Sequence, residues 1–162
     1  MTPTDRLLVG IDPGASGGIA WRFDGGLPAA ERMPKTEEEV CEILTDLAYS
    51  ANKPVAYLEQ VGGYIAGRPA PGSRMFNFGR GYGVIRAALI LAGYRIEDVT
   101  PVQWQKKLGI VLPPKGSSKD RKNILKGVAI DRYPTLADDV TLCTADALLI
   151  LEAGRQLERV KE

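Results

Sequence analysis

Short apolar runs alternate along the chain with longer stretches in which apolar residues recur every three or four positions. The runs predict β-strands, because they are short and turn residues such as Asp24-Gly25-Gly26 separate them. They span residues 6–11, 17–23, 29–33, 54–59 and 94–99. The periodic stretches predict helices, over residues 36–51, 75–92, 101–108, 119–133 and 145–160. Three strands followed by alternating helices and strands predict an α/β fold, a five-stranded mixed sheet with helices on both faces.

Local signals support several of these boundaries. Thr36 is followed three residues later by Glu39, which predicts a capping box at a helix start. Thr100 precedes Pro101, and proline is favoured at the first position of a helix. Residues 62–73 are rich in Gly and Pro and are predicted to form a loop. The length of 162 residues fits one domain, so we expect residues 1–162 to form a single unit.

Composition narrows the possible chemistry. The chain is 44% hydrophobic and 25% charged, which is typical of a globular protein. No apolar run reaches the ~18 residues of a membrane span and no signal-peptide pattern opens the chain, so a cytoplasmic protein is expected. Cys41 and Cys143 are far apart and are expected to be free thiols. The chain has no histidine, which excludes catalytic triads built on histidine and histidine-ligated zinc.

Positive charge is concentrated in one part of the chain. Between Gly62 and Lys126, Lys and Arg outnumber Asp and Glu by twelve to three, although the whole chain has a formal net charge of only +1. Such a segment predicts an anionic partner bound by one face. Scattered solvated charge is the alternative.

Three acids lie next to or within apolar stretches, where burial of a carboxylate is energetically costly. Asp12 and Glu59 each end an apolar strand and precede a glycine-containing turn, and Asp146 interrupts the apolar stretch of residues 145–151. Ligand sites of α/β sheets lie at such strand ends. Carboxylates without histidine suit hard cations such as Mg²⁺ or Mn²⁺, and two such ions can promote phosphodiester hydrolysis. Each acid alone could equally be a helix cap or a turn residue.

Six motifs in order resemble the RuvC-like Holliday junction resolvases, which have the RNase H-like fold. The resemblance covers residues 6–155 and includes features of the bacteriophage and chloroplast branch. The motifs are Gly10-Ile11-Asp12-Pro13-Gly14 with Ser16-Gly17-Gly18-Ile19-Ala20, Leu58-Glu59-Gln60-Val61, Phe78-Gly79-Arg80-Gly81-Tyr82-Gly83, Thr100-Pro101-Val102-Gln103-Trp104-Gln105-Lys106, Ser117-Ser118-Lys119-Asp120, and Ala145-Asp146-Ala147-Leu148-Leu149-Ile150.

The resemblance implies a homodimeric, Mg²⁺-dependent endonuclease that nicks two strands of a four-way DNA junction, with no nucleotide cofactor and no membrane partner. Mn²⁺ is expected to substitute, with two ions per site. Asp12, Glu59 and Asp146 would be metal ligands. If phage-encoded, the protein would act in the host cytoplasm.

The chain departs from the family at one position. The family has a fourth acid or a histidine three to five residues before the last acid, where this chain has Thr141, Leu142 and Cys143. Asp139 could substitute, because it would share a face with Asp146 if the helix extended to it. Otherwise the site has three protein carboxylates, or Cys143 lies at the edge of the metal site, where a thiol is a poor ligand for Mg²⁺.

DNA contacts are expected from Lys, Arg and aromatic residues outside the acid cluster. Lys119 is expected to approach the scissile phosphate, with a solvated helix face as the alternative. Tyr64 or Phe76 could insert at the strand exchange point, although Phe76 and Phe78 could equally be core or dimer residues. Gly81 and Ala87 mark the expected dimer contact by resemblance. The full set of expected DNA-binding residues is Tyr64, Arg68, Arg74, Phe76, Arg80, Lys115, Lys119, Arg121 and Lys122.

Two other classes of function remain open. A branched-DNA-binding protein that has lost catalysis would explain the missing fourth acid. A kinase of the actin-like group would explain the glycine-rich hairpin after Asp12, but those chains are far longer. ATP binding would separate the kinase from the other two classes, which would bind four-way DNA.

Overall fold

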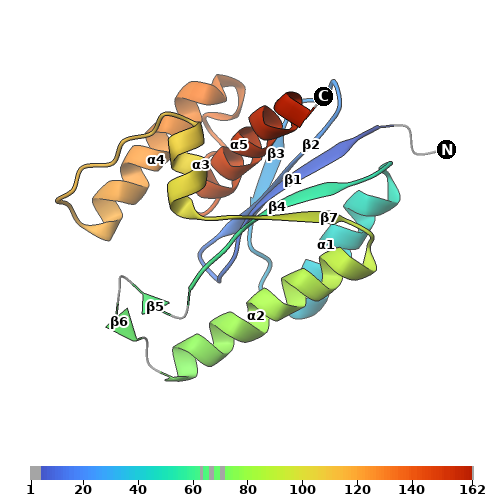
Figure 1. Cartoon of the computed structure of the whole chain (residues 1–162), viewed down its shortest axis with the longest axis horizontal. Helices are drawn as coiled ribbons and strands as arrows, with labels where there is room; N and C mark the ends of the chain where they lie inside the picture. Colours follow the sequence, from blue (N-terminus) through green and yellow to red (C-terminus); the bar gives the residue numbers. More distant parts are fainter. Residues whose placement is uncertain (1–4, 63, 66–67, 70–71, 162) are drawn as a thin grey trace.

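The computed structural model describes residues 5–62, 64–65, 68–69 and 72–161, with the backbone alone for residues 64–65 and 68–69. The main strands are β1 (Leu7–Asp12), β2 (Gly18–Phe23), β3 (Ala29–Arg32), β4 (Val55–Glu59) and β7 (Arg95–Val99). The helices are α1 (Glu37–Tyr49), α2 (Gly72–Leu91), α3 (Pro101–Lys107), α4 (Ser118–Arg132) and α5 (Ala145–Lys161). Figure 1 shows the sheet between two groups of helices.

The five main strands form one mixed sheet in the order β3-β2-β1-β4-β7. Strands β1, β2 and β3 form an antiparallel meander, and β4 and β7 continue from β1 as parallel neighbours. Parallel neighbours need a crossover connection, which α1 and α2 supply. The predicted fold class and all ten predicted elements are therefore confirmed.

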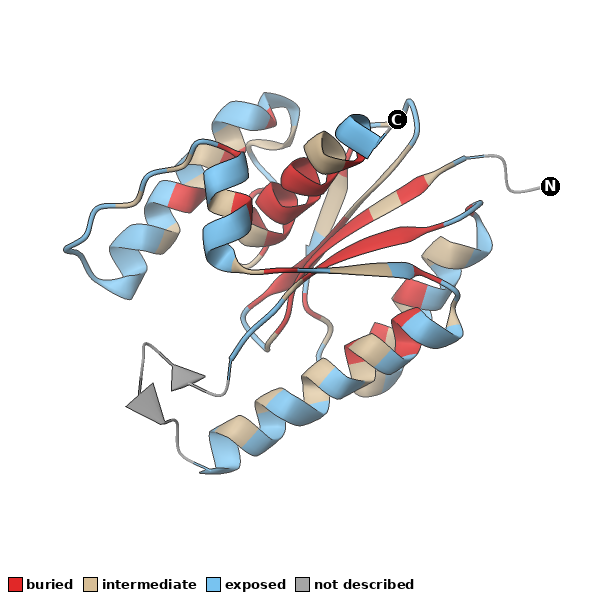
Figure 2. Cartoon of the chain, viewed as in Figure 1, coloured by how far each residue is buried: buried red, intermediate tan, exposed pale blue. Residues whose placement is uncertain are grey.

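Side chains of the central strands alternate between two hydrophobic cores. Leu7, Val9 and Ile11 of β1 point into a core shared with α1 and α2. Val55 and Tyr57 of β4 point into the opposite core, which includes α3, α4 and α5. Figure 2 shows the buried residues along the central strands and on the inner side of α5. The strand period of two thus fixes which side chains face α5.

Helix α5 lies directly on the sheet. A Cβ added at Gly10 would stand 2.5 Å from the backbone oxygen of Ala147, and a Cβ at Gly154 would meet the ring of Tyr57. Glycine at both positions lets the backbones approach more closely than any side chain would permit. This close contact fixes the first turn of α5 near the end of β1.

The structure corrects the sequence analysis in three places. The predicted loop over residues 62–73 contains two short antiparallel strands, β5 (Tyr64–Ile65) and β6 (Arg68–Pro69). Helix α2 begins at Gly72, earlier than the predicted residue 75. A 3₁₀ helix (Pro134–Leu136) lies between α4 and α5. Among the described helices, none is long and apolar enough to cross a membrane.

Candidate active site

Two of the three candidate acids lie side by side at the same edge of the sheet. Strands β1 and β4 are paired in parallel as far as Ile11 and Leu58. Asp12 and Glu59 are the next residues of the two strands. Because side chains alternate, Asp12 lies on the same face as Gly10, and Glu59 lies on the same face as Tyr57. Both side chains therefore lie on the face of the sheet that α5 covers.

The third acid comes from the helix on that face. Asp146 lies in the first turn of α5 and is half-buried. It directly precedes Ala147, whose backbone oxygen covers Gly10. Asp12 itself is buried, with only 8% of its surface exposed. The structure therefore brings together the acids that the sequence predicted, and their burial rules out simple exposed turn residues.

The electrostatics of these acids follow from burial and mutual repulsion. Burial and, to a lesser extent, the charges of Glu59 and Asp146 together raise the pKa of Asp12 to about 8, against the opposing effect of Lys122. Burial also raises the pKa of Glu59 to about 7, although a hydrogen bond from Trp104 lowers it. Burial likewise raises the pKa of Asp146. The cluster is short of positive charge, which is an arrangement typical of functional sites.

Among the described residues, Lys122 of α4 is the one cation whose charge affects the pKa values of all three acids. Its charge lowers the pKa of Asp12, Glu59 and Asp146. Lys122 is half-buried, whereas Lys119, one helical turn earlier, is exposed in the first turn of α4. Sequence reasoning assigned Lys122 to DNA binding and missed its place beside the acids. The i, i+3 spacing from Lys119 was the available signal.

Glu59 also has a specific hydrogen-bond donor. The indole Nε1 of Trp104, in α3, donates to Oε2 of Glu59 at 2.7 Å. Trp104 is 1% exposed, so its N–H has no access to water. Sequence reasoning recorded Trp104 only as part of a motif. A lone large aromatic in a short polar helix was the signal that could have identified it.

Three oxygen-donor side chains short of positive charge fit a divalent cation of the Mg²⁺ or Mn²⁺ type. Asp12, Glu59 and Asp146 are the residues that would hold it. In the described part of the chain, however, no three acids or cysteines are already arranged as a complete set of ligands. Binding would therefore include adjustment of these side chains.

The predicted substitute ligand is not placed as the shared-face argument required. Helix α5 begins at Ala145, and Asp139 lies in a separate, exposed turn. It lines a cavity of 430 Å³ together with Arg32 of β3 and Cys143. The assumption of a continuous helix was wrong, because Thr141 and Thr144 form a local turn with their own hydrogen bonds. Asp139 as a ligand stays a prediction.

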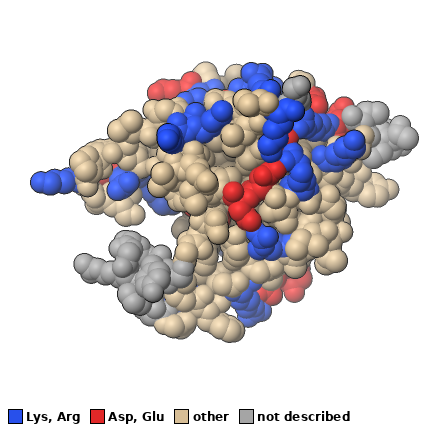
Figure 3. Space-filling model, in the orientation of Figure 1, with Lys and Arg blue, Asp and Glu red and all other residues tan. Residues whose placement is uncertain are grey.

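The predicted DNA-binding residues divide into two groups on either side of the acids. Lys115, Lys119 and Arg121 are exposed on α4 and the loop before it, and Figure 3 shows positive side chains where this loop projects at the left. Arg74 and Arg80 line a cleft of 610 Å³ between α2 and the loop after β1. The side chains of Tyr64 and Arg68 lie outside what the structure describes.

This cleft adjoins the acid cluster through Gly14. Gly14 has a φ of +107°, a conformation that favours glycine. The Phe78 ring lies 3.3 Å from the position of a Cβ at Gly14. Phe78 is half-buried and stacks near Tyr82, whereas Phe76 is 70% exposed and is therefore no core residue. In the cleft, Arg80 forms an ion pair with Glu37.

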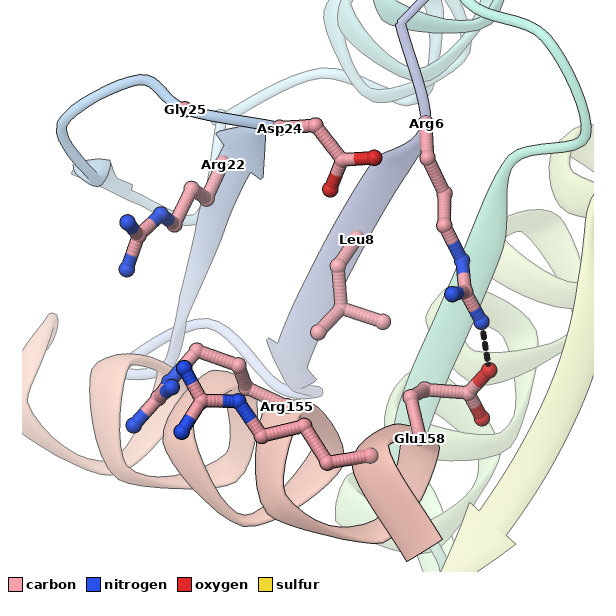
Figure 4. Close-up of a pocket in the computed structure, with 8 residues that line it drawn as sticks. Arg6, Leu8, Arg22, Asp24, Gly25, Arg155 and Glu158 are labelled. Carbon is pink, nitrogen blue, oxygen red and sulfur yellow. Dashed lines mark hydrogen bonds and ion pairs between the residues drawn. The ribbon is translucent and has the colours of Figure 1, made fainter. Parts of the chain in front are cut away.

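A second set of buried acids lies on α5, toward its other end. Oε1 of Glu158 accepts a hydrogen bond from the Tyr57 hydroxyl at 2.7 Å, and Glu158 also forms ion pairs with Arg6, Arg95 and Lys161. Figure 4 shows the contact between Arg6 and Glu158 beside a pocket that Arg22 and Arg155 also line. Burial favours a higher pKa for Glu158, but these donors outweigh it and lower the pKa to about 2. These contacts stabilise the ionised form of Glu158.

Of the comparisons with known proteins, the one with solved structures supports the fold. No protein-family model matches the chain, and no curated protein matches it in sequence. Among solved structures, the chain is similar to RuvC from Thermus thermophilus in complex with a Holliday junction substrate, at 17% identity, 96% coverage of each chain and a TM-score of 0.57. A second structure of Thermus thermophilus RuvC gives 14% identity, the same coverage and a TM-score of 0.53. The chain therefore has the RNase H-like fold of RuvC.

Proposed function

We propose that this protein is a divalent-cation-dependent endonuclease that resolves four-way DNA junctions by paired phosphodiester hydrolysis. The observation that carries the proposal is the cluster of Asp12 and Glu59 at two strand ends with Asp146 of α5, which has no paired cation among the described residues of a RuvC-type fold. The junction in the similar RuvC complex supports branched DNA as the substrate class.

The acids and the positive residues of α4 would have different roles in this reaction. Asp12, Glu59 and Asp146 would hold two Mg²⁺ ions, which would activate water and stabilise the leaving oxygen. Lys122 offsets the negative charge of the acids before substrate binds. Lys119 and Lys122 share one side of α4 and would face the phosphate that approaches the acids. The exposed positive residues of α4 and the preceding loop would bind flanking phosphates.

A homodimer would present two such sites to two strands, and helix α2 offers the surface for it. Exposed residues at helical spacing form a stripe along α2 that consists of Phe76, Gly79, Gly83, Ala87 and Ile90. Nothing lies within 4 Å of a Cβ added at Gly79 or Gly83, so a second helix could approach closely. Gly81, which the sequence grouped with Ala87, instead lines the cleft beside Gly14. A two-fold axis through α2 suits a symmetric junction.

One observation favours a weaker second function, a branched-DNA-binding protein with reduced catalysis. The described residues contain no complete ligand set, and Asp139 lies in a separate turn. Such a protein would keep the basic face of α4 and bind junctions without cutting them.

The test is cleavage of a labelled four-way junction against a linear duplex of the same arm sequence, in Mg²⁺, Mn²⁺ or EDTA. Paired nicks in the junction alone, with either metal, are the expected result. Asp131→Asn provides a matched control variant, because Asp131 is an exposed acid on α4. Tight junction binding without cleavage in any metal would contradict the nuclease proposal and favour the binding protein.

A further inference from the structure

The strongest unexplained feature beside the acids is the buried indole of Trp104. We propose that Trp104 is a positioning residue, which holds Oε2 of Glu59 through its N–H and so fixes the carboxylate for a divalent cation. This inference rests on the proposed function and deepens it. It concerns how the site is held in place before any cation or DNA is bound.

The contact has the geometry of a strong hydrogen bond. Nε1 of Trp104 and Oε2 of Glu59 are 2.7 Å apart, and the ring is 1% exposed. Bonds from an N–H to a carboxylate are shorter and stronger than neutral ones. A buried indole N–H also needs a partner, because no water reaches it. The bond therefore restricts rotation of the Glu59 carboxylate about its terminal torsion.

The chain directs Trp104 to Glu59 through local structure. Glu59 pairs with Val99 of β7, and the backbone N–H of Gln60 donates to the Val99 oxygen at 2.7 Å. The chain turns at Thr100, where a capping box with Gln103 fixes the first turn of α3. Trp104 follows in that turn and is the only buried residue of α3. The position of α3 thus follows from the end of the strand beside Glu59.

The bond also differentiates the two oxygens of Glu59. Oε2 is engaged by the indole, and no other hydrogen bond reaches either oxygen within the described residues. Oε1 therefore keeps all of its acceptor sites for a cation, whereas the indole occupies one of those of Oε2. Partners that orient a ligating carboxylate typically change metal affinity or activity about 10- to 100-fold when removed.

The second tryptophan provides an internal comparison. Trp21 in β2 is half-buried and packs against the core on the α1 and α2 side of the sheet. It donates no hydrogen bond to a carboxylate among the described residues. A tryptophan whose role is only packing therefore already exists in this chain, and Trp104 differs from it by the bond to Glu59.

The experiment removes the N–H and keeps the shape of the ring. Trp104 is replaced by β-(3-benzothienyl)alanine, in which sulfur stands in place of the N–H, and Mn²⁺ affinity is measured by titration calorimetry without DNA. We expect Mn²⁺ affinity to fall about 10-fold or more, kcat for junction cleavage to fall with it, and the junction Kd in EDTA to stay unchanged. Trp21→Phe is the control and should leave all three values as in the wild type.

The outcomes separate this inference from the proposed function. Equal Mn²⁺ affinities for the wild type and the benzothienyl variant would overturn the role of Trp104 and leave the nuclease proposal standing. A wild-type titration that Asp146→Asn leaves unchanged would overturn the metal site itself, and this inference with it. Trp104→Phe offers a second variant, and its thermal unfolding shows whether a loss of affinity follows from a loss of packing.

Discussion

Carboxylates lie against or on the buried face of α5 in two regions, and their pKa values are shifted in opposite directions in the two. Near the first turn, Asp146 joins Asp12 and Glu59; burial raises the pKa values of all three, and repulsion between the acids adds to this for Asp12 and Glu59. Toward the last turns, Glu152 and Glu158 are at least as buried, yet hydrogen bonds and ion pairs lower their pKa values against the effect of burial.

The difference lies in the partners. Arg155 holds Glu152 with two hydrogen bonds, and Arg6, Arg95 and Lys161 hold Glu158. Among the described residues, the acids at the first turn have only the longer-range influence of Lys122 and the bond from Trp104 to Glu59. An unpaired buried charge lowers the free energy of unfolding, so we expect it to be retained where function requires it. Burial of an acid alone therefore does not distinguish the two ends of α5, whereas the presence of a paired cation does.

The largest effect is expected at the first turn of α5. Asp146→Asn removes one charge and one ligand from the cluster, and junction cleavage should fall at least ~1,000-fold because the metal chemistry is lost. Junction binding should stay nearly unchanged in a mobility-shift assay in EDTA, since phosphate contacts come from other residues. Normal cleavage by this variant would contradict the assignment of the site and remove the distinction between the two ends.

A smaller loss of activity is expected from the one cation near the acids. Lys122→Ala should slow cleavage about 100-fold, the range seen when a group that stabilises developing charge is removed. Lys119→Ala should also slow cleavage more than it weakens binding, if this side chain approaches the scissile phosphate. Single-turnover rates and junction Kd values for both variants check this. An unchanged rate for Lys119→Ala would assign that residue to the solvated face of α4.

The sequence predicted the main elements because their signals are local. Each central strand is a short apolar run, and the capping box at Thr36 and the cap at Thr100 before Pro101 mark two helix starts that the structure confirms. The β5–β6 hairpin was missed because Gly and Pro, which predict turns, also surround very short strands. Asp12, Glu59 and Asp146 were found because an acid in an apolar stretch is itself a local signal.

The contacts between distant segments could not be predicted in the same way. Trp104 and Glu59 are 45 positions apart, and their bond depends on how α3 turns back from β7. Whether Lys119 or Lys122 lies near the acids depends on the rotation of α4 about its own axis relative to the sheet. No local sequence pattern determines this rotation. The position of Asp139 relative to Asp146 is also not fixed by a local pattern, because the turn of Thr141 and Thr144 separates it from α5.

The opposite end of α5 should respond in stability and leave the chemistry unaffected. Glu158→Gln leaves the cations around it with weaker partners, and the free energy of unfolding should fall by about 2 kcal/mol. Urea unfolding at pH 7 measures this change. The rate of junction cleavage per folded molecule should stay as in the wild type, because Glu158 lies away from the first turn of α5. A loss of cleavage in a folded variant would show that the two ends are coupled.

The smallest effect, and the sharpest contrast, is expected in the pH dependence of stability without metal. The pKa of Asp12 is about 8 in the folded protein and 3.8 in the unfolded chain. Between these two pH values, the folded state therefore binds more protons than the unfolded state. Stability from this group is therefore lost as pH rises through that window. For Glu158, with a folded pKa of about 2 against 4.5, stability is present above pH 4.5 and is lost as pH falls.

Asp12→Asn removes the buried charge and should therefore make the metal-free protein more stable than the wild type at pH 8, by about 1 to 2 kcal/mol. The difference should shrink toward pH 4, where Asp12 is protonated in the folded state. Urea unfolding in EDTA at both pH values measures it. Added Mn²⁺ should stabilise the wild type and should stabilise the variant much less. Equal pH slopes for the two proteins would mean that folding does not raise the pKa of Asp12, and this contrast between the two ends of α5 would be lost.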